Sequence, residues 1–185
     1  MEGAEMTNTF EIRSGGSLRT NSTGKLTGYA AVYNSESRDL GGFVEIIRRG
    51  AFDASLKSGV NIRALWQHDG KALLGTTQAG TLRLIEDPKG LAFELDLPST
   101  STGKDLSILV DRGDVAGCSF GFRVRENGDR WEERGTSLVR ELLDVDLIEI
   151  TLTDDPAYMD TSIAKRSMPQ LAGARSLHAL WLDTL

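Results

Sequence analysis

The clearest β pattern in the chain is the stretch Val115-Ala116-Gly117-Cys118-Ser119-Phe120-Gly121-Phe122-Arg123-Val124. Successive side chains of a strand point to opposite faces, so alternate residues share a face. Alternation puts Ala116, Cys118, Phe120, Phe122 and Val124 on one face, and Gly117, Ser119, Gly121 and Arg123 on the other. The stretch therefore predicts a strand with one buried, apolar face and a serine between two glycines on its other face.

Further segments of this kind lie on both sides and indicate a mainly β protein. The segments with a strand pattern are 26–33, 42–47, 63–67, 80–86, 91–97, 130–133, 139–142 and 145–152. The turn Asp87-Pro88-Lys89-Gly90 is typical of a hairpin, and helices are expected over 52–57 and 103–112, the second begun by Thr102 and ended by Gly113. We predict a mainly β (α+β) fold, a closed or nearly closed antiparallel β-barrel with a few short surrounding helices, although a sandwich would give a similar pattern.

Size and composition exclude several classes of protein. The chain has 185 residues, which fits one domain, and its apolar stretches fall far short of the ~20 residues of a membrane span. A net charge of -6 argues against a surface for nucleic-acid backbones. The single cysteine cannot form an internal disulfide, and residues 1–10 lack the pattern of a secretory leader. We therefore expect a cytoplasmic protein that binds neither nucleic acid nor membrane.

Few residues in the chain could carry chemistry. With two histidines, one cysteine and none of the familiar metal, phosphate or nucleotide motifs, we expect no metal and no cofactor. His68 follows the apolar run Ala64-Leu65-Trp66 at a strand end, where catalytic groups are common; the alternative is a surface turn residue. His178 is more typical of the polar face of a short terminal helix.

A serine and a carboxylate could complete a catalytic set with His68. The glycines beside Ser119 leave its hydroxyl open to an imidazole or a peptide, as a nucleophile requires; the alternative is a serine that fills a small space at a bulge. Alternation places Glu149 with Val145, Leu147 and Thr151, and Asp144 and Asp146 with Ile148 and Ile150. A carboxylate on an apolar strand face needs a partner, which a histidine N–H could be, whereas a carboxylate at a rim would face water.

Several short motifs, taken in order, resemble those of the prohead maturation protease family of tailed bacteriophages. They are Gly28-Tyr29-Ala30-Ala31-Val32-Tyr33-Asn34, Ile46-Ile47-Arg48-Arg49-Gly50-Ala51-Phe52, Leu65-Trp66-Gln67-His68-Asp69, Gly117-Cys118-Ser119-Phe120-Gly121-Phe122, Leu147-Ile148-Glu149-Ile150-Thr151-Leu152 and Asp155-Pro156-Ala157. Their order and spacing are specific and span residues 25–165. That family is related to the herpesvirus assemblins, serine proteases on a mainly β barrel surrounded by helices, so the resemblance implies an assemblin-like fold.

The resemblance also implies roles for individual residues. Ser119 would be the nucleophile and His68 the general base. Glu149 is our choice for the third member, with Asp146 as the alternative, because the assemblins use a second histidine there and this segment has none. No cofactor is implied, and the oxyanion donors would be backbone N–H groups or an arginine such as Arg123.

The implied function is that of a serine endopeptidase that cleaves segments of the scaffold and major capsid proteins, and itself, during prohead maturation. It would act in the host cytoplasm inside the assembling phage procapsid, controlled by confinement there and by formation of a homodimer. One alternative is a non-catalytic β-barrel module for capsid assembly or scaffold binding that has lost turnover. Another is an esterase that uses the same three residues.

This interpretation divides the chain into three parts. Residues 1–20, with the run Ser14-Gly15-Gly16-Ser17, would be a flexible N-terminal arm with at most one edge strand over 9–13. Residues 21–165 would be the protease domain. Residues 166–185 would be a C-terminal tail or a short docking helix, whose apolar face could contact the domain, a second copy or the scaffold; that face consists of Leu177, Leu180, Trp181 and Leu185.

Overall fold

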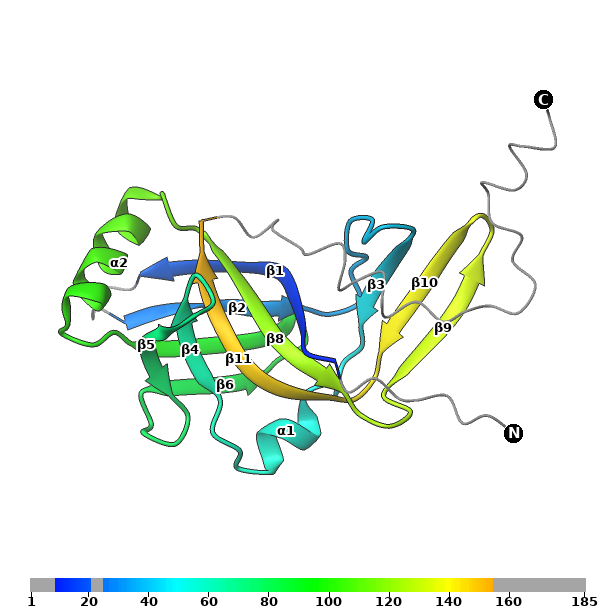
Figure 1. The fold of residues 1–185 in the computed structure, drawn as a ribbon, viewed down its shortest axis with the longest axis horizontal. Coiled ribbons are helices and arrows are strands. Elements are labelled where there is room, and N and C mark those ends of the chain that lie inside the picture. Colours follow the sequence, from blue (N-terminus) through cyan, green and yellow to red (C-terminus); the bar gives the residue numbers. More distant parts are fainter. Residues whose placement is uncertain (1–8, 21–24, 155–185) are drawn as a thin grey trace.

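The computed structural model describes residues 9–20 and 25–154, which form two β-sheets and two helices (Figure 1). The strands are β1 (Glu11–Thr20), β2 (Lys25–Val32), β3 (Phe43–Ile47), β4 (Arg63–Trp66), β5 (Asp69–Thr76), β6 (Leu82–Glu86), β7 (Gly90–Asp96), β8 (Gly117–Val124), β9 (Asp129–Arg134), β10 (Ser137–Leu142) and β11 (Val145–Thr153). The helices are α1 (Asp53–Lys57) and α2 (Ser101–Arg112). The prediction of a mainly β fold with few helices is confirmed.

The larger sheet has eight strands in the order β5-β4-β11-β8-β1-β2-β7-β6, and buried apolar residues from its central and edge strands form the main core. Cys118, Phe120 and Phe122 of β8 are buried, as the alternation predicts. The Phe120 ring meets Phe52, just before α1, edge to face with 5.4 Å between the ring centroids. Aromatic pairs in this geometry stabilise a core beyond the area that they bury.

One buried serine fastens α1 to β11. Ser55 Oγ donates to the carbonyl of Val145 at 2.8 Å and accepts from the N–H of Leu147 at 2.9 Å. These two bonds satisfy backbone groups at the start of β11, before its pairing with β4 begins at Glu149. The helix therefore helps to fix the strand that carries Glu149.

The larger sheet does not close into a barrel. Its edge strands β5 and β6 follow one another in the chain, but no ladder joins them. Instead, the N–H of Thr76 bonds to Oγ1 of Thr81 at 3.0 Å, and a Cβ added to Gly75 would lie 2.7 Å from Cδ1 of Leu95 on β7. The sheet thus curls until its two edges come into contact without pairing. The number of strands alone does not predict whether a sheet closes into a barrel. Nor is the fold wholly antiparallel, since β4 pairs with β11, and β3 with β10, in parallel.

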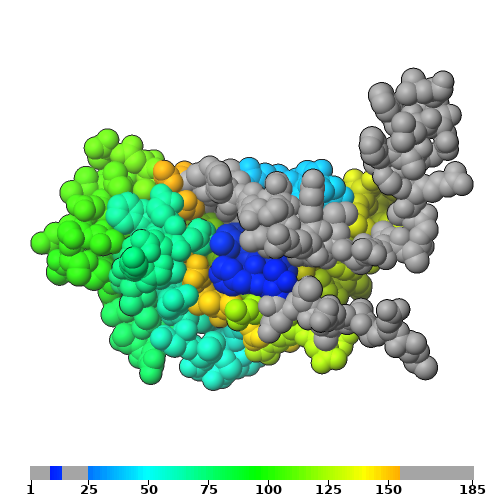
Figure 2. Space-filling model, viewed as in Figure 1, coloured from blue at the N-terminus to red at the C-terminus, as the bar shows by residue number. Residues whose placement is uncertain are grey.

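The N-terminal segment is part of the sheet, not an arm. β1 lies between β8 and β2, so the expectation of at most an edge strand over 9–13 is wrong. Glu11 and Arg13 are buried in a network of ion pairs with each other and with Glu45 and Arg140 of the smaller sheet, at 2.6–3.2 Å. Figure 2 shows residues 9–13, in dark blue, near the middle of one face of the molecule.

The smaller sheet has the order β3-β10-β9 and packs at one end of the larger one (Figure 1). The predicted helices are present, although Thr100, not Thr102, caps α2 by accepting from the N–H of Gly103. Gly113 ends α2 with a left-handed φ of 82°, as predicted. The predicted tail over 166–185 lies outside the described residues. Within the described part of the chain, no helix is long and apolar enough to cross a membrane.

Candidate active site

Ser119 lies on the face of β8 that points away from Phe120 and the aromatic core. Its Cα partners are Ser14 on β1 and Thr151 on β11, so a strand runs past it on each side. Only 1% of the residue is exposed. Gly117 and Gly121, two positions away on the same face, present no side chain that would keep a base from its hydroxyl.

His68 reaches Ser119 from a tight turn between β4 and β5. Trp66 pairs with Asp69, which leaves Gln67 and His68 as the two central residues of the turn. Both have a φ of 55°, as two-residue hairpin turns often require and as few side chains adopt. The sequence analysis ended the strand at residue 67 and placed the next one at 80–86, so it missed β5. Nε2 of His68 lies 2.7 Å from Oγ of Ser119.

Glu149 reaches the same face through a β-bulge in β11. Leu147 pairs with Phe122, and Glu149 pairs with Gly121. Between these two pairs the chain moves two residues along β11 but only one residue along β8. A bulge adds one residue and thereby turns the following side chains to the other face. The prediction that Glu149 shares a face with Leu147 is wrong for this reason: Leu147 stays with the core, and Glu149 points to the side of Ser119.

A line of contacts joins these side chains. Nδ1 of His68 lies 3.0 Å from Oε1 of Glu149, and Oε2 of the same carboxylate accepts a bond of 3.0 Å from Nη2 of Arg63. Because Glu149 is only 5% exposed, its charge needs these partners. The structure therefore brings together Ser119, His68 and Glu149, which the sequence analysis had selected from three distant segments.

This geometry suits proton transfer from a hydroxyl. When Nδ1 of His68 donates its hydrogen to Glu149, the lone pair of Nε2 faces Oγ of Ser119 and can accept a proton from it. The carboxylate then stabilises the imidazolium that forms. The arrangement can thus convert a serine hydroxyl into a nucleophile without a metal or cofactor.

Two residues of the site were not predicted from the sequence. Arg63 opens β4 and is the Cα partner of Glu149, and its only signal was a charge before an apolar run. Phe10 lies just before β1, and nothing in the sequence around it indicated a place near Ser119. A Cβ added to Gly121 would lie 2.5 Å from Cζ of Phe10 and 2.9 Å from Cγ of Glu149. The glycine therefore leaves the space that both side chains fill.

Asp146, the alternative third member, lies away from His68. It is the Cα partner of Arg123 and accepts bonds from Nε and Nη2 of Arg125 at 2.7 and 2.6 Å. Asp146 and Arg123 line a cavity of about 400 Å³ that Arg63 also borders. The structure does not bring Asp146 to His68, so the geometry favours Glu149.

Two other side chains near Ser119, those of Cys118 and Thr151, are less suited to act as a nucleophile. Burial raises the pKa of the Cys118 thiol to about 12, so it stays protonated at neutral pH and is a poor nucleophile. Thr151 is also buried, and its Oγ1 has no hydrogen-bond partner among residues 9–20 and 25–154. Ser119 is thus distinguished from both by its contact with an imidazole.

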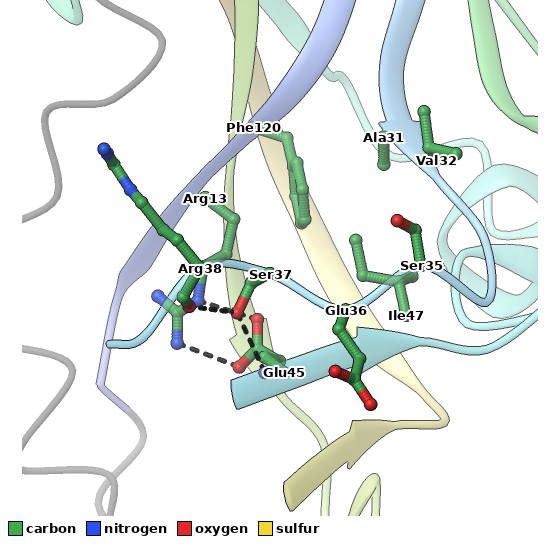
Figure 3. A pocket seen from close by; sticks show the side chains of 10 residues that line it. All are labelled: Arg13, Ala31, Val32, Ser35, Glu36, Ser37, Arg38, Glu45, Ile47 and Phe120. Atoms are coloured by element: carbon green, nitrogen blue, oxygen red, sulfur yellow. Dashed lines mark hydrogen bonds and ion pairs between the residues drawn. The ribbon is translucent and has the colours of Figure 1, made fainter. Parts of the chain in front are cut away.

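A second hollow, of about 100 Å³, lies where the two sheets meet. Figure 3 shows Phe120, Ala31 and Ile47 along its apolar side and the Arg13–Glu45 ion pair at one end. Phe120 enters it from the face of β8 opposite to Ser119, so the hollow does not open onto the candidate site. In the described ranges, no group of three His, Cys, Asp or Glu residues is placed to hold a metal ion.

Comparison with known proteins adds independent findings. A family model described as caudovirus prohead serine protease matches residues 8–173. Among solved structures, the capsid assembly protease gp21 of bacteriophage T4 superposes with a TM-score of 0.53, covering 78% of this chain and 96% of that one. The two sequences are 7% identical, so this likeness concerns the fold alone. No curated protein sequence matches the chain.

Proposed function

The chain belongs to the caudovirus prohead serine proteases, and from that premise we propose that Ser119, His68 and Glu149 are its nucleophile, general base and orienting carboxylate. The protein is thus a serine protease with a role in capsid maturation. The observation that carries the assignment of residues is the continuous line of contacts, 2.7 Å from Ser119 to His68 and 3.0 Å from His68 to Glu149.

In the proposed mechanism, Nε2 of His68 accepts the hydroxyl proton as Oγ of Ser119 attacks the scissile carbonyl. The imidazolium then gives that proton to the leaving amine, and water hydrolyses the acyl-enzyme by the same route. Backbone N–H groups would stabilise the oxyanion. Arg123 is a weaker candidate for this task, because it lies further along β8, roughly 13 Å from Ser119 at 3.3 Å per residue.

The substrates that fit this role are segments of the scaffold and major capsid proteins, together with terminal segments of the protease itself. The family description supports action on a prohead, and hence inside the assembling procapsid. If the active form is a homodimer, the protease activity would also depend on the local concentration of the protease. The match over residues 8–173 and the central position of β1 support a protease domain that begins before residue 21.

Labelling with a fluorophosphonate tests the nucleophile without knowledge of the natural substrate. The full chain is incubated with the probe, and intact mass and peptide mapping locate the adduct. We expect one adduct on Ser119, which is absent in Ser119→Ala and forms far more slowly in His68→Ala. An adduct elsewhere, or an unchanged rate in His68→Ala, would show that the roles are wrong.

Co-expression with the scaffold and major capsid proteins tests the reaction class. Discrete fragments that form with the wild type and are absent with Ser119→Ala would support an endopeptidase. Hydrolysis of small esters without any peptide cleavage would favour the esterase, and co-purification with intact scaffold would favour a binding module. Glu149→Gln and Asp146→Asn, compared under the same conditions, decide between the two carboxylates, with loss expected only for Glu149→Gln.

A further inference from the structure

We propose that Arg63 is a positioning residue of the catalytic site, which acts through Glu149 and does not touch the substrate. The inference rests on the proposed function, since it assumes that Glu149 orients His68. Arg63 binds the carboxylate oxygen that His68 leaves unused: His68 contacts Oε1, and Nη2 of Arg63 donates to Oε2 at 3.0 Å.

A carboxylate held at one oxygen is poorly oriented. The terminal torsion of a glutamate side chain is broad, with no sharp staggered minimum. A single contact with His68 would therefore let the carboxylate plane turn about that contact. The second bond, from Arg63 to the opposite oxygen, fixes the plane and with it the direction in which Nδ1 of His68 must point.

The backbone places Arg63 for this task. Arg63 and Glu149 are Cα partners in the parallel pair of β4 and β11, so the two side chains leave adjacent strands on the same face. The same strand β4 leads into the turn that carries His68. A shift of β4 relative to β11 would move the imidazole and the guanidinium together, so both contacts to Glu149 depend on the same strand pairing.

Charge gives a second reason for the pairing. The Glu149 side chain is 6% exposed, and a buried carboxylate without a cation is strongly disfavoured. The Arg63 side chain is 42% exposed and borders the cavity of about 400 Å³ that Arg123 and Asp146 also line. The guanidinium thus connects the buried carboxylate to an open cavity, and this opening makes a direct test practicable.

The test is chemical rescue of Arg63→Ala. Truncation removes the guanidinium and enlarges a cavity through which free guanidinium ions can reach Oε2 of Glu149. The readout is the rate of fluorophosphonate labelling of Ser119, separated into probe affinity and maximal rate. We expect the maximal rate to fall about tenfold to hundredfold with little change in probe affinity, and millimolar guanidinium to restore much of it. Arg63→Lys should lose less than Arg63→Ala.

Arg125→Ala is the matched control. It also removes an arginine from a carboxylate of β11, Asp146, but one outside the line of contacts. It should label at the wild-type rate and show no response to guanidinium, while its melting temperature reports the structural cost of losing such a pair. Labelling of Arg63→Ala at the wild-type rate would overturn the inference. A loss in Arg63→Ala that neither guanidinium nor lysine restores would overturn it in favour of a purely structural role.

Glu149→Gln separates failure of this inference from failure of the proposed function. If Glu149→Gln labels Ser119 at the wild-type rate, Glu149 is not the orienting carboxylate, and both proposals fall. If Glu149→Gln is slow but Arg63→Ala is not, only the role of Arg63 falls. If Arg63 acts through Glu149, adding Arg63→Ala to Glu149→Gln should cause little further loss, because the interaction is already broken.

Discussion

Replacing Gly121 with alanine would test how closely the site is packed around Glu149. The added Cβ would lie 2.5 and 2.7 Å from two ring carbons of Phe10 and 2.9 Å from Cγ of Glu149. Real Cβ atoms do not approach carbon so closely, so both neighbours must move by about half an ångström or more. Glu149 has little freedom to do so, since His68 and Arg63 hold its two oxygens.

The expected effects on stability and rate follow from this crowding. Overpacking a buried site costs about 1–3 kcal/mol, and removal of a glycine from a strand returns roughly 0.5–1 kcal/mol. A net loss of about 1–2 kcal/mol corresponds to a melting temperature lower by about 2–8 °C for a domain of this size. Because a shift of about 1 Å at a catalytic group can cost a hundredfold in rate, we expect labelling of Ser119 to slow about tenfold.

A second variant identifies which neighbour is responsible. Gly121→Ala combined with Phe10→Ala removes the contacts with the ring but keeps the contact with Glu149. Differential scanning calorimetry should then show partial recovery of stability relative to Gly121→Ala, while fluorophosphonate labelling stays slow. A single variant as active and stable as the wild type would refute the packing argument, and full recovery of rate in the double variant would show that Glu149 is not displaced.

Three further predictions concern residues away from the line of contacts. Ser55→Ala should lower the unfolding free energy by about 1–3 kcal/mol in urea denaturation, because it leaves two buried backbone groups of β11 unpaired; an unchanged midpoint would contradict this. Cys118 should resist a thiol reagent at pH 8 in the native protein and react only in denaturant, since burial raises its pKa to about 12. Hydrogen bonds from Arg48 and Arg130 lower the pKa of Glu141 from 4.5 to about 2, so its stabilising contribution is present above pH 4.5 and is lost as the pH falls toward 2. Glu141→Gln should therefore flatten the dependence of stability on pH in that window, and an equally steep dependence would contradict the assignment.

Strand faces could be predicted from the sequence only where the strand is regular. β8 keeps its alternation without interruption, so Ser119 and Phe120 fall on the predicted sides. In β11 the alternation breaks where two apolar residues, Leu147 and Ile148, stand next to each other. The bulge lies there, and it turns Glu149 to the face of Ser119. In β11 the doubled apolar residue therefore marks the position of the bulge.

Other features depend on partners that are distant in the sequence. Glu11 and Arg13 look solvent-exposed until Glu45 and Arg140, from the smaller sheet, are placed beside them. Whether a sheet closes into a barrel depends on whether its two edge strands pair with each other, and not on the number of strands. In this protein the edges meet near Gly75 without pairing. Local periodicity contains no information about either.

The parallel pairing of β11 with β4 also bears on when the protease can first become active. β11 lies between β4 and β8, so it separates the strand before His68 from the strand of Ser119 and supplies Glu149 as well. A ribosome adds about 5–20 residues per second and makes β11 after every other described strand, so the sheet cannot form around β11 until the other described strands have been synthesised. Ser119 and His68 are therefore synthesised before the strand that lies between β8 and β4, and we expect proteolysis only once β11 has joined the sheet.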